Sequence, residues 1–444
     1  MDLAKALTLT GQDNPSQHFA TFSESLDFDL VEQALEATGK ASIRKRKLPA
    51  ERVITLIIGM GMLRDRSIQA VCDHLHLTLP DQKGQSQSIR SSSLANARQR
   101  LGSQPMEQLF NLTTEAFCRS YIEFDTWYGL TTYGIDGSTL NVPDSQENCQ
   151  EFGLASSGNR GESGYPKVRL VGLMRLGSHR LVSLKIGSYA ESEVSLAEDL
   201  FDLIEDNSLL MVDRGLLCWS RFWHYQQEGN NRHWLVRAKS NFKCKVIEQL
   251  GDGDELVEIS FSHSTRKEDP SLPKTMLARV IAYCIPGFRP QKLITSLLDP
   301  IPFPASAVIE VHHQRWEYEL SLDEVKTHSL ERAEAIRSRS PELVKQELWG
   351  LAVTYNLVRQ EMARIAKDLG VSPINLSYRW CLLLIRNLWL SAWVVAAATL
   401  PKHLEQLAAD VNNLLLPKRR SLRRNPREVK VKMSGYKKKP RKVA

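Results

Sequence analysis

The chain has 444 residues, 42% of them apolar and 25% charged, with a net charge of +7, a composition that is ordinary for a globular protein of several domains. Its seven cysteines form no C-x-x-C pair and no zinc-spaced cluster with histidine, which excludes a disulfide scaffold and favours a reduced, intracellular protein. There is no signal-peptide pattern, and the most apolar run, Asn387 to Pro401, is shorter than the roughly 20 residues of a membrane span, so we expect no membrane segment.

The first part of the chain, up to residue 125, is predicted to be all-helical. Its apolar periodicity indicates helices at Asp29 to Thr38, Pro49 to Met62, Ser67 to His76, Leu94 to Leu101 and Met106 to Tyr121. Three serines from Ser91 are suited to cap the helix that carries Arg98 and Arg100, and a basic run, Arg44 to Lys47, lies upstream. Because helix N-termini and basic side chains bind phosphate, this region suits a DNA-binding domain. A small bundle with a solvated charged face explains the same pattern equally well.

From Leu130 the apolar period changes to that of strands. Strands are predicted at Thr131 to Val142, Val168 to Leu176, Arg180 to Ser188, Leu209 to Asp213 and Trp234 to Lys239, with helices at Ser192 to Glu205 and Cys218 to Gln227. This order is typical of a mixed sheet with helices packed on it, in which three antiparallel strands are followed by parallel ones.

Two acidic residues lie at unusual places in these strands. Asp136 is in the middle of the first strand, between Gly134 and Gly137, and Asp213 ends the fourth. An acid inside an otherwise apolar strand is costly unless it is paired or bound to a metal. Each is therefore a functional candidate, although each taken alone is more simply a turn-forming or capping aspartate.

The stretch from Val311 to Leu330 has no proline or glycine and many good helix formers, which predicts a helix. At about 100° per residue, Arg315, Glu319 and Lys326 fall on one side of that helix, with His312 beside them. One carboxylate is thus flanked by two cations, a pattern that a salt-bridged surface helix also produces.

Taken together, Asp136, Asp213 and Glu319 indicate a metal site. Three carboxylates that converge on one edge of a sheet can hold two divalent cations about 4 Å apart and promote in-line attack of water or a 3′-hydroxyl on a phosphodiester. Ligands that are all oxygen favour Mg²⁺ or Mn²⁺.

These motifs resemble the D-D-E transposases of the insertion sequence four family. The similar segments are I-D-G-S-T at Asp136, M-V-D-R-G at Asp213 and the run that contains Glu319. The family signature around the catalytic glutamate is Tyr-x2-Arg-x3-Glu-x6-Lys, and three of its four positions match. The tyrosine position holds His312 instead.

The resemblance extends to the N-terminal helices, at Ile43 to Leu75 and Ser93 to Gly102, and to the segment Ser340 to Arg359, so that it covers about residues 20 to 435. It implies a ribonuclease-H-like mixed sheet in which the metal ligands are Asp136, Asp213 and Glu319, with two Mg²⁺ or Mn²⁺ ions. Arg315 and Lys326 would hold DNA phosphates. The further DNA-binding candidates are His312, Arg98, Arg100, Arg160, Lys167 and Arg169.

Three of these candidates belong to or follow a glycine-rich segment, Gly153 to Gly164. That segment lacks the G-K-[ST] ending of a nucleotide-binding loop, so a nucleotide site is not expected. We expect a flexible loop beside the active site instead, with Arg160, Lys167 and Arg169 available to backbone phosphates.

The expected domains are a helical DNA-binding domain (1–125), the first part of the catalytic core (126–239), a β-rich insertion (240–304), a catalytic helix that completes the core (305–335), C-terminal helices (336–416) and a basic disordered tail (417–444). The insertion is expected because the distance in sequence from Asp213 to Glu319 is too long for a direct connection. Some relatives stack a tryptophan from the insertion on a flipped base. No tryptophan occurs from Leu235 to Gln314, so stacking would fall to Phe261, Tyr283 or Phe288, and hairpin formation during excision stays open.

The tail from Pro417 has thirteen basic residues and one acid, Glu428, which is typical of a segment that binds polyanions, or of a merely solubilising one.

The function that the family resemblance implies is that of a bacterial, cytoplasmic transposase. It would bind terminal inverted repeats and target DNA, pair two ends as a homodimer, and cut and join DNA on the nucleoid. A catalytically silent DNA-binding regulator and a general nuclease of the same fold are the alternatives. End-bearing and random DNA would separate the nuclease from the transposase.

Overall fold

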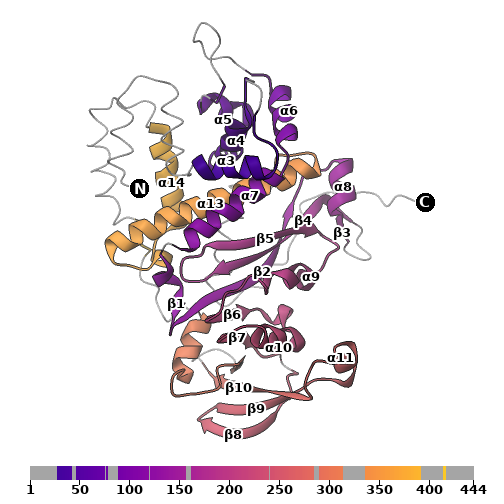
Figure 1. Ribbon diagram of the computed structural model, residues 1–444, viewed down its shortest axis with the longest axis vertical. Coiled ribbons are helices and arrows are strands. Elements are labelled where there is room, and N and C mark those ends of the chain that lie inside the picture. Colours follow the sequence, from indigo (N-terminus) through magenta and orange to yellow (C-terminus); the bar gives the residue numbers. More distant parts are fainter. Residues whose placement is uncertain are drawn as a thin grey trace, which may run out of the picture.

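The computed structural model describes residues 28–42, 47–75, 77–78, 89–119, 121–156, 162–239, 241–284, 290–313, 336–391 and 414–416. Figure 1 shows helices gathered at one end of the molecule, a large sheet in the middle and a group of antiparallel strands at the opposite end. The chain is thus a mixed α/β protein, as predicted from its sequence. No helix within these described ranges is long and apolar enough to cross a membrane. The predicted tail lies outside them.

The strands form one mixed sheet in the order β3-β4-β2-β6-β7-β11-β10-β9-β8, with β1 beside β2 and β5 beside β4. Their bounds are β1 (Thr126–Trp127), β2 (Leu130–Asn141), β3 (Leu154–Ser156), β4 (Glu162–Arg175), β5 (Leu181–Ser188), β6 (Ser208–Val212), β7 (Arg232–Arg237), β8 (Lys245–Gly251), β9 (Asp254–Ser260), β10 (Thr275–Tyr283) and β11 (Gln291–Thr295). Strand β4 is antiparallel to both of its neighbours, β2 and β5, whereas β6 and β7 run parallel to β2. The predicted change from antiparallel to parallel strands is therefore confirmed.

Strands β8 to β11 lie in the segment where a β-rich insertion was expected, near all four predicted positions. They are antiparallel, and β11 pairs with β7, so they continue the core sheet instead of forming a separate one. This segment also contains the short helix α11 (His263–Glu268), which was not predicted. Residues 305–313 then form a helix that leads toward residue 319.

The two faces of the sheet are covered by different helices. The central strand β6 shows this best, because all of its residues are buried and they alternate between two cores. Leu209 and Met211 pack in the core that contains the N-terminal helices, whereas Leu210 and Val212 pack with α9 (Glu193–Ala197) and α10 (Trp219–Gln227). A strand buried on both faces is expected to be apolar, as this one is from Leu209 to Val212.

The N-terminal helices are α3 (Phe28–Ala37), α4 (Ala50–Met62), α5 (Ile68–His74), α6 (Ser91–Leu101) and α7 (Gln104–Cys118). Each lies within a few residues of a predicted helix. The serine capping predicted for α6 is wrong, because the helix begins at Ser91 itself and Arg90 is its N-cap. No side chain caps it there, so the serines belong to the first turn.

Helix α13 (Pro341–Leu369) joins these helices to the sheet (Figure 1). A Cβ atom on Gly350 would lie 2.4 Å from Ile57 Cγ2, so this glycine lets α4 and α13 approach closely. The Leu181 N–H donates to Asn356 Oδ1 at 3.0 Å, and Asn356 Nδ2 donates to the Leu181 carbonyl oxygen at 2.8 Å. Because Leu181 begins β5, α13 also holds that end of the sheet. Helix α14 (Tyr378–Ser391) follows it.

Two further differences from the prediction concern short elements. The helix expected at Ser192 to Glu205 is only α9 followed by a 3-10 turn, Glu198–Leu200. The longer helix was predicted from the spacing of apolar residues. Leu200 and Phe201 are indeed buried, but the backbone after the 3-10 turn is not helical. Helix α8 (Gln146–Phe152) and strand β3 were missed, since neither is long enough to show a clear period.

Candidate active site

Asp136 lies in the middle of β2, next to Asp213, which directly follows the end of the neighbouring strand β6. In the parallel pairing of β2 with β6, Ile135 is opposite Val212, and the two aspartates are the next residues. Asp213 remains extended, with φ −77° and ψ 159°, so the alternation of side chains continues through it. Because paired strands lie about 4.8 Å apart, the two carboxylates project from adjacent backbone positions on the same face.

That face is the one covered by the N-terminal helices and α13. Val212 and Ile135 belong to the opposite core, with α9 and α10, so the residue that follows each of them points the other way. Both aspartates are half-buried. Asp136 Oδ1 accepts a hydrogen bond of 2.8 Å from the Gly137 N–H. The Asp213 carbonyl oxygen accepts a hydrogen bond of 3.0 Å from the Leu216 N–H, and this bond closes the turn after β6.

Gly137 faces the Glu193 side chain of α9, on the side of the sheet opposite Asp136. A Cβ atom there would lie 2.6 Å from Glu193 Cδ, since α9 packs against this part of β2. Glu193 forms an ion pair of 2.9 Å with Arg169 on β4. The β2 and β4 register pairs Arg169 with Thr139 and Lys167 with Asn141, so both cations lie on the face opposite Asp136. We expected them beside the acids, and the structure separates them.

Ser138 lies on the same face as Asp136 and was missed in the sequence. It is 6% exposed, and among the described residues its hydroxyl has no hydrogen-bond partner. The signal was present in I-D-G-S-T, because residues two apart in a strand share a face. Ser138 thus adds a hydroxyl donor to the candidate site.

The third acid, Glu319, and the cations Arg315 and Lys326 lie outside the described residues, as does Arg160. The helix at 305–313 leads into that segment. Its Val308 and Val311 belong to the same core as the β6 residues on the aspartate face. Within the described ranges, no three acidic, histidine or cysteine side chains gather closely enough to hold a metal.

His312 differs from its predicted role as a DNA contact. It is 3% exposed, and the neighbouring His313 ring lies 5.8 Å from the ring of Tyr283 on β10. A buried imidazole cannot reach a phosphate on the surface, so the structure does not support His312 as a DNA contact. Of the predicted stacking residues, Phe261 is buried against Trp223, which leaves Tyr283, whereas Phe288 lies outside the described residues.

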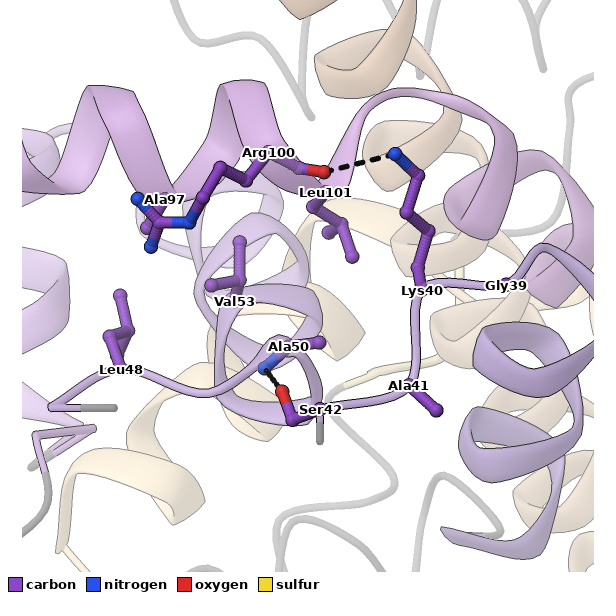
Figure 2. Close-up of a pocket in the computed structure, with 10 residues that line it drawn as sticks. All are labelled: Gly39, Lys40, Ala41, Ser42, Leu48, Ala50, Val53, Ala97, Arg100 and Leu101. Atoms are coloured by element: carbon purple, nitrogen blue, oxygen red, sulfur yellow. Dashed lines mark hydrogen bonds between the residues drawn. The ribbon is translucent and has the colours of Figure 1, made fainter. Parts of the chain in front are cut away.

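Arg100 lies at a groove on the N-terminal helices (Figure 2). The groove encloses about 490 Å³ between α4, α6 and the segment after α3, where Lys40 Nζ donates to the Arg100 carbonyl oxygen at 3.2 Å. A smaller hollow of about 190 Å³ shares Arg100 and adds Lys47, Ser93 and Asn96. The described residues that line the two hollows include three cations and no acid, so this surface suits a polyanion.

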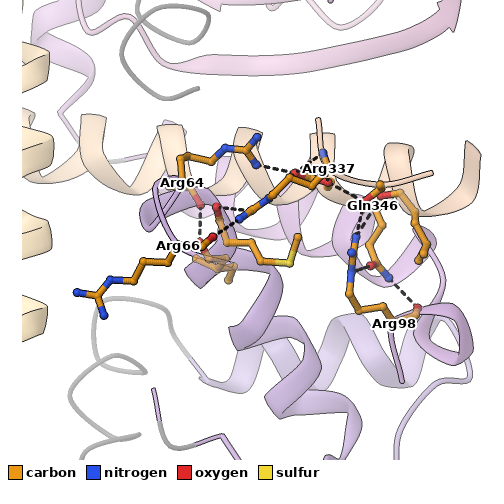
Figure 3. Close-up of polar contacts among 11 residues, drawn as sticks. Arg64, Arg66, Arg98, Arg337 and Gln346 are labelled. Atoms are coloured by element: carbon orange, nitrogen blue, oxygen red, sulfur yellow. Dashed lines mark hydrogen bonds and ion pairs between the residues drawn. The ribbon is translucent and has the colours of Figure 1, made fainter. Parts of the chain in front are cut away.

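Arg98 was predicted to contact DNA, but the structure does not support this role. The residue is 2% exposed, and its guanidinium forms hydrogen bonds inside the protein (Figure 3). Its Nε donates to Gln346 Oε1 at 2.9 Å, and its Nη2 donates to Ser338 Oγ at 3.0 Å and to the Leu343 carbonyl oxygen at 3.2 Å. Arg98 therefore joins α6 to the start of α13. Of these two arginines, Arg98 is buried and Arg100 faces solvent.

Comparison with known families agrees with this arrangement. Residues 16–111 match the family "Insertion element 4 transposase N-terminal", and residues 127–357, which include both aspartates and residue 319, match the family "Transposase DDE domain". This chain belongs to the DDE transposases of the insertion element 4 type. It is a DNA transposase, and proteins of this family bind DNA and use divalent metal ions.

Individual proteins are similar over different lengths. The transposase InsG for insertion sequence element IS4 of Escherichia coli strain K12 is 31% identical over 445 residues, which is 100% of this chain and 99% of that protein. The putative transposase InsZ of the same strain is 32% identical over 227 residues, 51% of this chain and 74% of that protein. A piggyBac transposase synaptic complex with hairpin DNA has a TM-score of 0.42 and 12% identity, over 94% of this transposase and 85% of that chain.

Replacing Arg98 by Ala is expected to destabilise the transposase, because the change removes a hydrogen-bond partner from both Gln346 and Ser338 inside the protein. Breaking a buried charged network of this kind costs roughly 3 kcal/mol or more. Thermal unfolding should show a clear fall in melting temperature. The matched control is Arg100→Ala on the exposed side of the same helix, which should melt like the wild-type protein. Equal melting temperatures for both variants would contradict the buried role of Arg98.

Proposed function

We propose that this transposase moves an insertion sequence by cut-and-paste transposition, with Asp136, Asp213 and Glu319 as its catalytic acids. The observation that carries this proposal is the pairing of β2 with β6, which sets the first two carboxylates side by side on one face. The N-terminal region would bind the terminal inverted repeats, and two chains would bring two ends together. Each end would be cut, and its free 3′-hydroxyl would be joined to target DNA. The division into domains given above is part of the same proposal.

The strand order supports a ribonuclease-H-like core. The sequence β5-β4-β2-β6-β7 has three antiparallel strands followed by two that are parallel to the first, with helices on both faces. In this arrangement the first acid belongs to the central strand and the second to the end of its parallel neighbour, which are the places of Asp136 and Asp213.

The proposed place of Glu319 is supported by the helix that precedes it. Six positions separate Glu319 from His313, a reach of at most about 20 Å of extended chain. The helix packs in the core on the aspartate face, so the chain enters the undescribed segment from the correct side of the sheet. Arg315 and Lys326 belong to that segment, and we propose that they hold DNA phosphates next to the acids.

The donors at the site fit a hard divalent cation. Carboxylate oxygens are the ligands preferred by Mg²⁺ and Mn²⁺, and we propose that Asp136, Asp213 and Glu319 would hold two such ions. Bound there, the ions would supply neutralisation of the charge that develops on the phosphate under attack. Ser138 would donate its hydroxyl hydrogen to a phosphate oxygen on the same face. Tyr283, near the end of β10, is the described aromatic residue proposed to stack on a base.

If Asp136 and Asp213 are catalytic, replacing either one should largely abolish DNA cleavage but leave DNA binding intact. Asp213→Asn and Asp136→Asn should each slow Mg²⁺-dependent cleavage of end-bearing DNA by about 10³-fold or more, because ligand removal forfeits several kcal/mol of transition-state stabilisation. Melting temperature and DNA affinity should be retained. Gel analysis of cleaved strands measures the rate, with Asp202→Asn, on the exposed surface after α9, as the control. Cleavage by Asp213→Asn at the wild-type rate would refute the assignment.

The groove around Arg100 is proposed to bind the DNA backbone. Removing Arg100 and Lys47 together should weaken binding and flatten the slope of log affinity against log salt by about 0.9 for each phosphate that the protein no longer neutralises. Titrations at several salt concentrations measure that slope.

The matched control for this experiment is Arg119→Ala. Arg119 is exposed at the end of α7 and paired with Glu115 in its own helix at 2.6 Å, away from the groove. An unchanged slope in the Arg100 and Lys47 variant would show that DNA passes elsewhere.

A further inference from the structure

Arg237 lies at the end of β7, in register with the two aspartates. The last pair in the parallel pairing of β6 with β7 is Val212 with Val236. Asp213 and Arg237 are the residues that follow, just as Asp136 follows the last pair of β2 with β6. The three residues therefore occupy neighbouring positions on β2, β6 and β7, which lie side by side (Figure 1). Because paired strands are about 4.8 Å apart, the backbone of Arg237 is one strand spacing from Asp213 and two from Asp136.

The Arg237 side chain is on the same face of the sheet as the two carboxylates. Val236 packs in the core with α9 and α10, so the next residue points to the opposite face. The pairing with β11 agrees, because Arg237 is opposite Leu293, which packs in the core that contains the N-terminal helices. One guanidinium and two carboxylates thus project from one face at adjacent positions.

The guanidinium of Arg237 has no counterion in the part of the chain that the structure describes. The residue is half-buried, and it forms no side-chain hydrogen bond or ion pair there. Arg232, at the other end of the same strand, is by contrast paired with Asp206 at 3.0 Å. A charge that has lost part of its hydration without gaining a counterion favours the binding of an anion.

The same face continues from Arg237 to an aromatic ring. Gln291 and Tyr283 are paired in the register of β11 with β10, and both share the face of Leu293, which is two residues from Gln291. The Tyr283 hydroxyl donates to Gln291 Oε1 at 3.2 Å. Burial raises the pKa of the Tyr283 phenol and the charge of Arg237 acts in the opposite direction, so that charge lies near the hydroxyl. Two acids, a guanidinium and an aromatic ring therefore follow one another across the sheet from β2 to β10.

This order of groups fits the successive parts of a DNA strand. Metal ions at the acids would bind the phosphate under attack. A guanidinium binds two oxygens of a phosphate through parallel hydrogen bonds, and an aromatic ring stacks on a base. A strand that crosses β6, β7 and β10 on this face would meet the three kinds of group in that order.

We propose that Arg237 binds the phosphate next to the one that is cleaved, and that the cleaved strand lies along this face from the aspartates toward Tyr283. This inference rests on the proposed function, because Asp136 and Asp213 mark the place of the cleaved phosphate. Arg237 contacts DNA and no metal ion. It fixes the strand so that the bond to be broken lies at the acids.

The test combines changes in the full-length transposase with one change in the DNA. End-bearing duplexes carry a single methylphosphonate, which is uncharged, at the phosphate on one or the other side of the cleavage site. The protein variants are Arg237→Ala, Arg237→Lys and the control Lys292→Ala. Lys292 is an exposed cation of β11 that precedes Leu293 and so points to the opposite face. Single-turnover cleavage with Mg²⁺, DNA affinity without metal and melting temperature are measured for each combination.

On unmodified DNA, Arg237→Ala is expected to cleave roughly 10- to 100-fold more slowly than wild type, the loss expected when a hydrogen bond to a charged group is removed. Arg237→Lys should keep part of the rate, because it retains the charge but not the planar fork, and it carries the test if the alanine variant does not fold. Lys292→Ala should match wild type.

The modified duplexes identify the phosphate. One of the two methylphosphonates should slow cleavage by the wild-type protein by a similar factor and weaken its metal-free binding. The same methylphosphonate should change both values by no more than about twofold in Arg237→Ala, because the contact is already absent. In Lys292→Ala it should act as it does in wild type.

Two outcomes would overturn the contact. One is cleavage by Arg237→Ala at the wild-type rate. The other is a loss from Arg237→Ala that multiplies with the loss from each methylphosphonate, which would show that Arg237 acts through the fold or on another part of the DNA. Failure of the wild-type transposase itself to cleave unmodified end-bearing DNA would instead refute the proposed function, so the two failures are distinguishable.

Discussion

The parallel, in-register pairing of β2 with β6 is the constraint on which the site depends. It sets Asp136 and Asp213 next to each other although 77 positions of sequence separate them. A slip of one residue in either strand would turn one carboxylate to the opposite face, against α9 and α10. The register is secured because β6 is buried on both faces, with Leu209 and Met211 in one core and Leu210 and Val212 in the other. Core packing therefore determines the geometry of the chemistry.

Much of the sheet and the places of both aspartates could be predicted, because long apolar strands and an acid within them leave clear signals. The DNA contacts could not be predicted from charge alone. Arg98 lies on the same helical stripe as Leu94, Ala97 and Leu101, which shows in retrospect that it points inward. Arg169 could not be separated from Asp136 without the register of β4, and the continuation of the core sheet into β11 has no local sequence signal at all.

The N-terminal region and the catalytic core are one packed structure in this transposase. Helix α13 lies against α4 and α7 and also holds Leu181 at the start of β5. The buried Glu347 of α13 also forms ion pairs with Arg64 at 2.5 Å and with Arg337 at 3.3 Å. Apolar packing would have been at least as stable there, which favours a role of these charges in geometry over one in stability. Helix α13 therefore joins the N-terminal helices to the sheet.

The most direct measurement is iron-mediated cleavage of the protein backbone. Fe²⁺ takes the place of Mg²⁺ at carboxylate sites, and with ascorbate and peroxide it cuts the chain next to the bound ion. Three carboxylates that share one site should give cuts near Asp136, Asp213 and Glu319, all of which should disappear in Asp213→Asn. Cuts near the two aspartates with none near Glu319, or cuts that persist in that variant, would contradict a shared site.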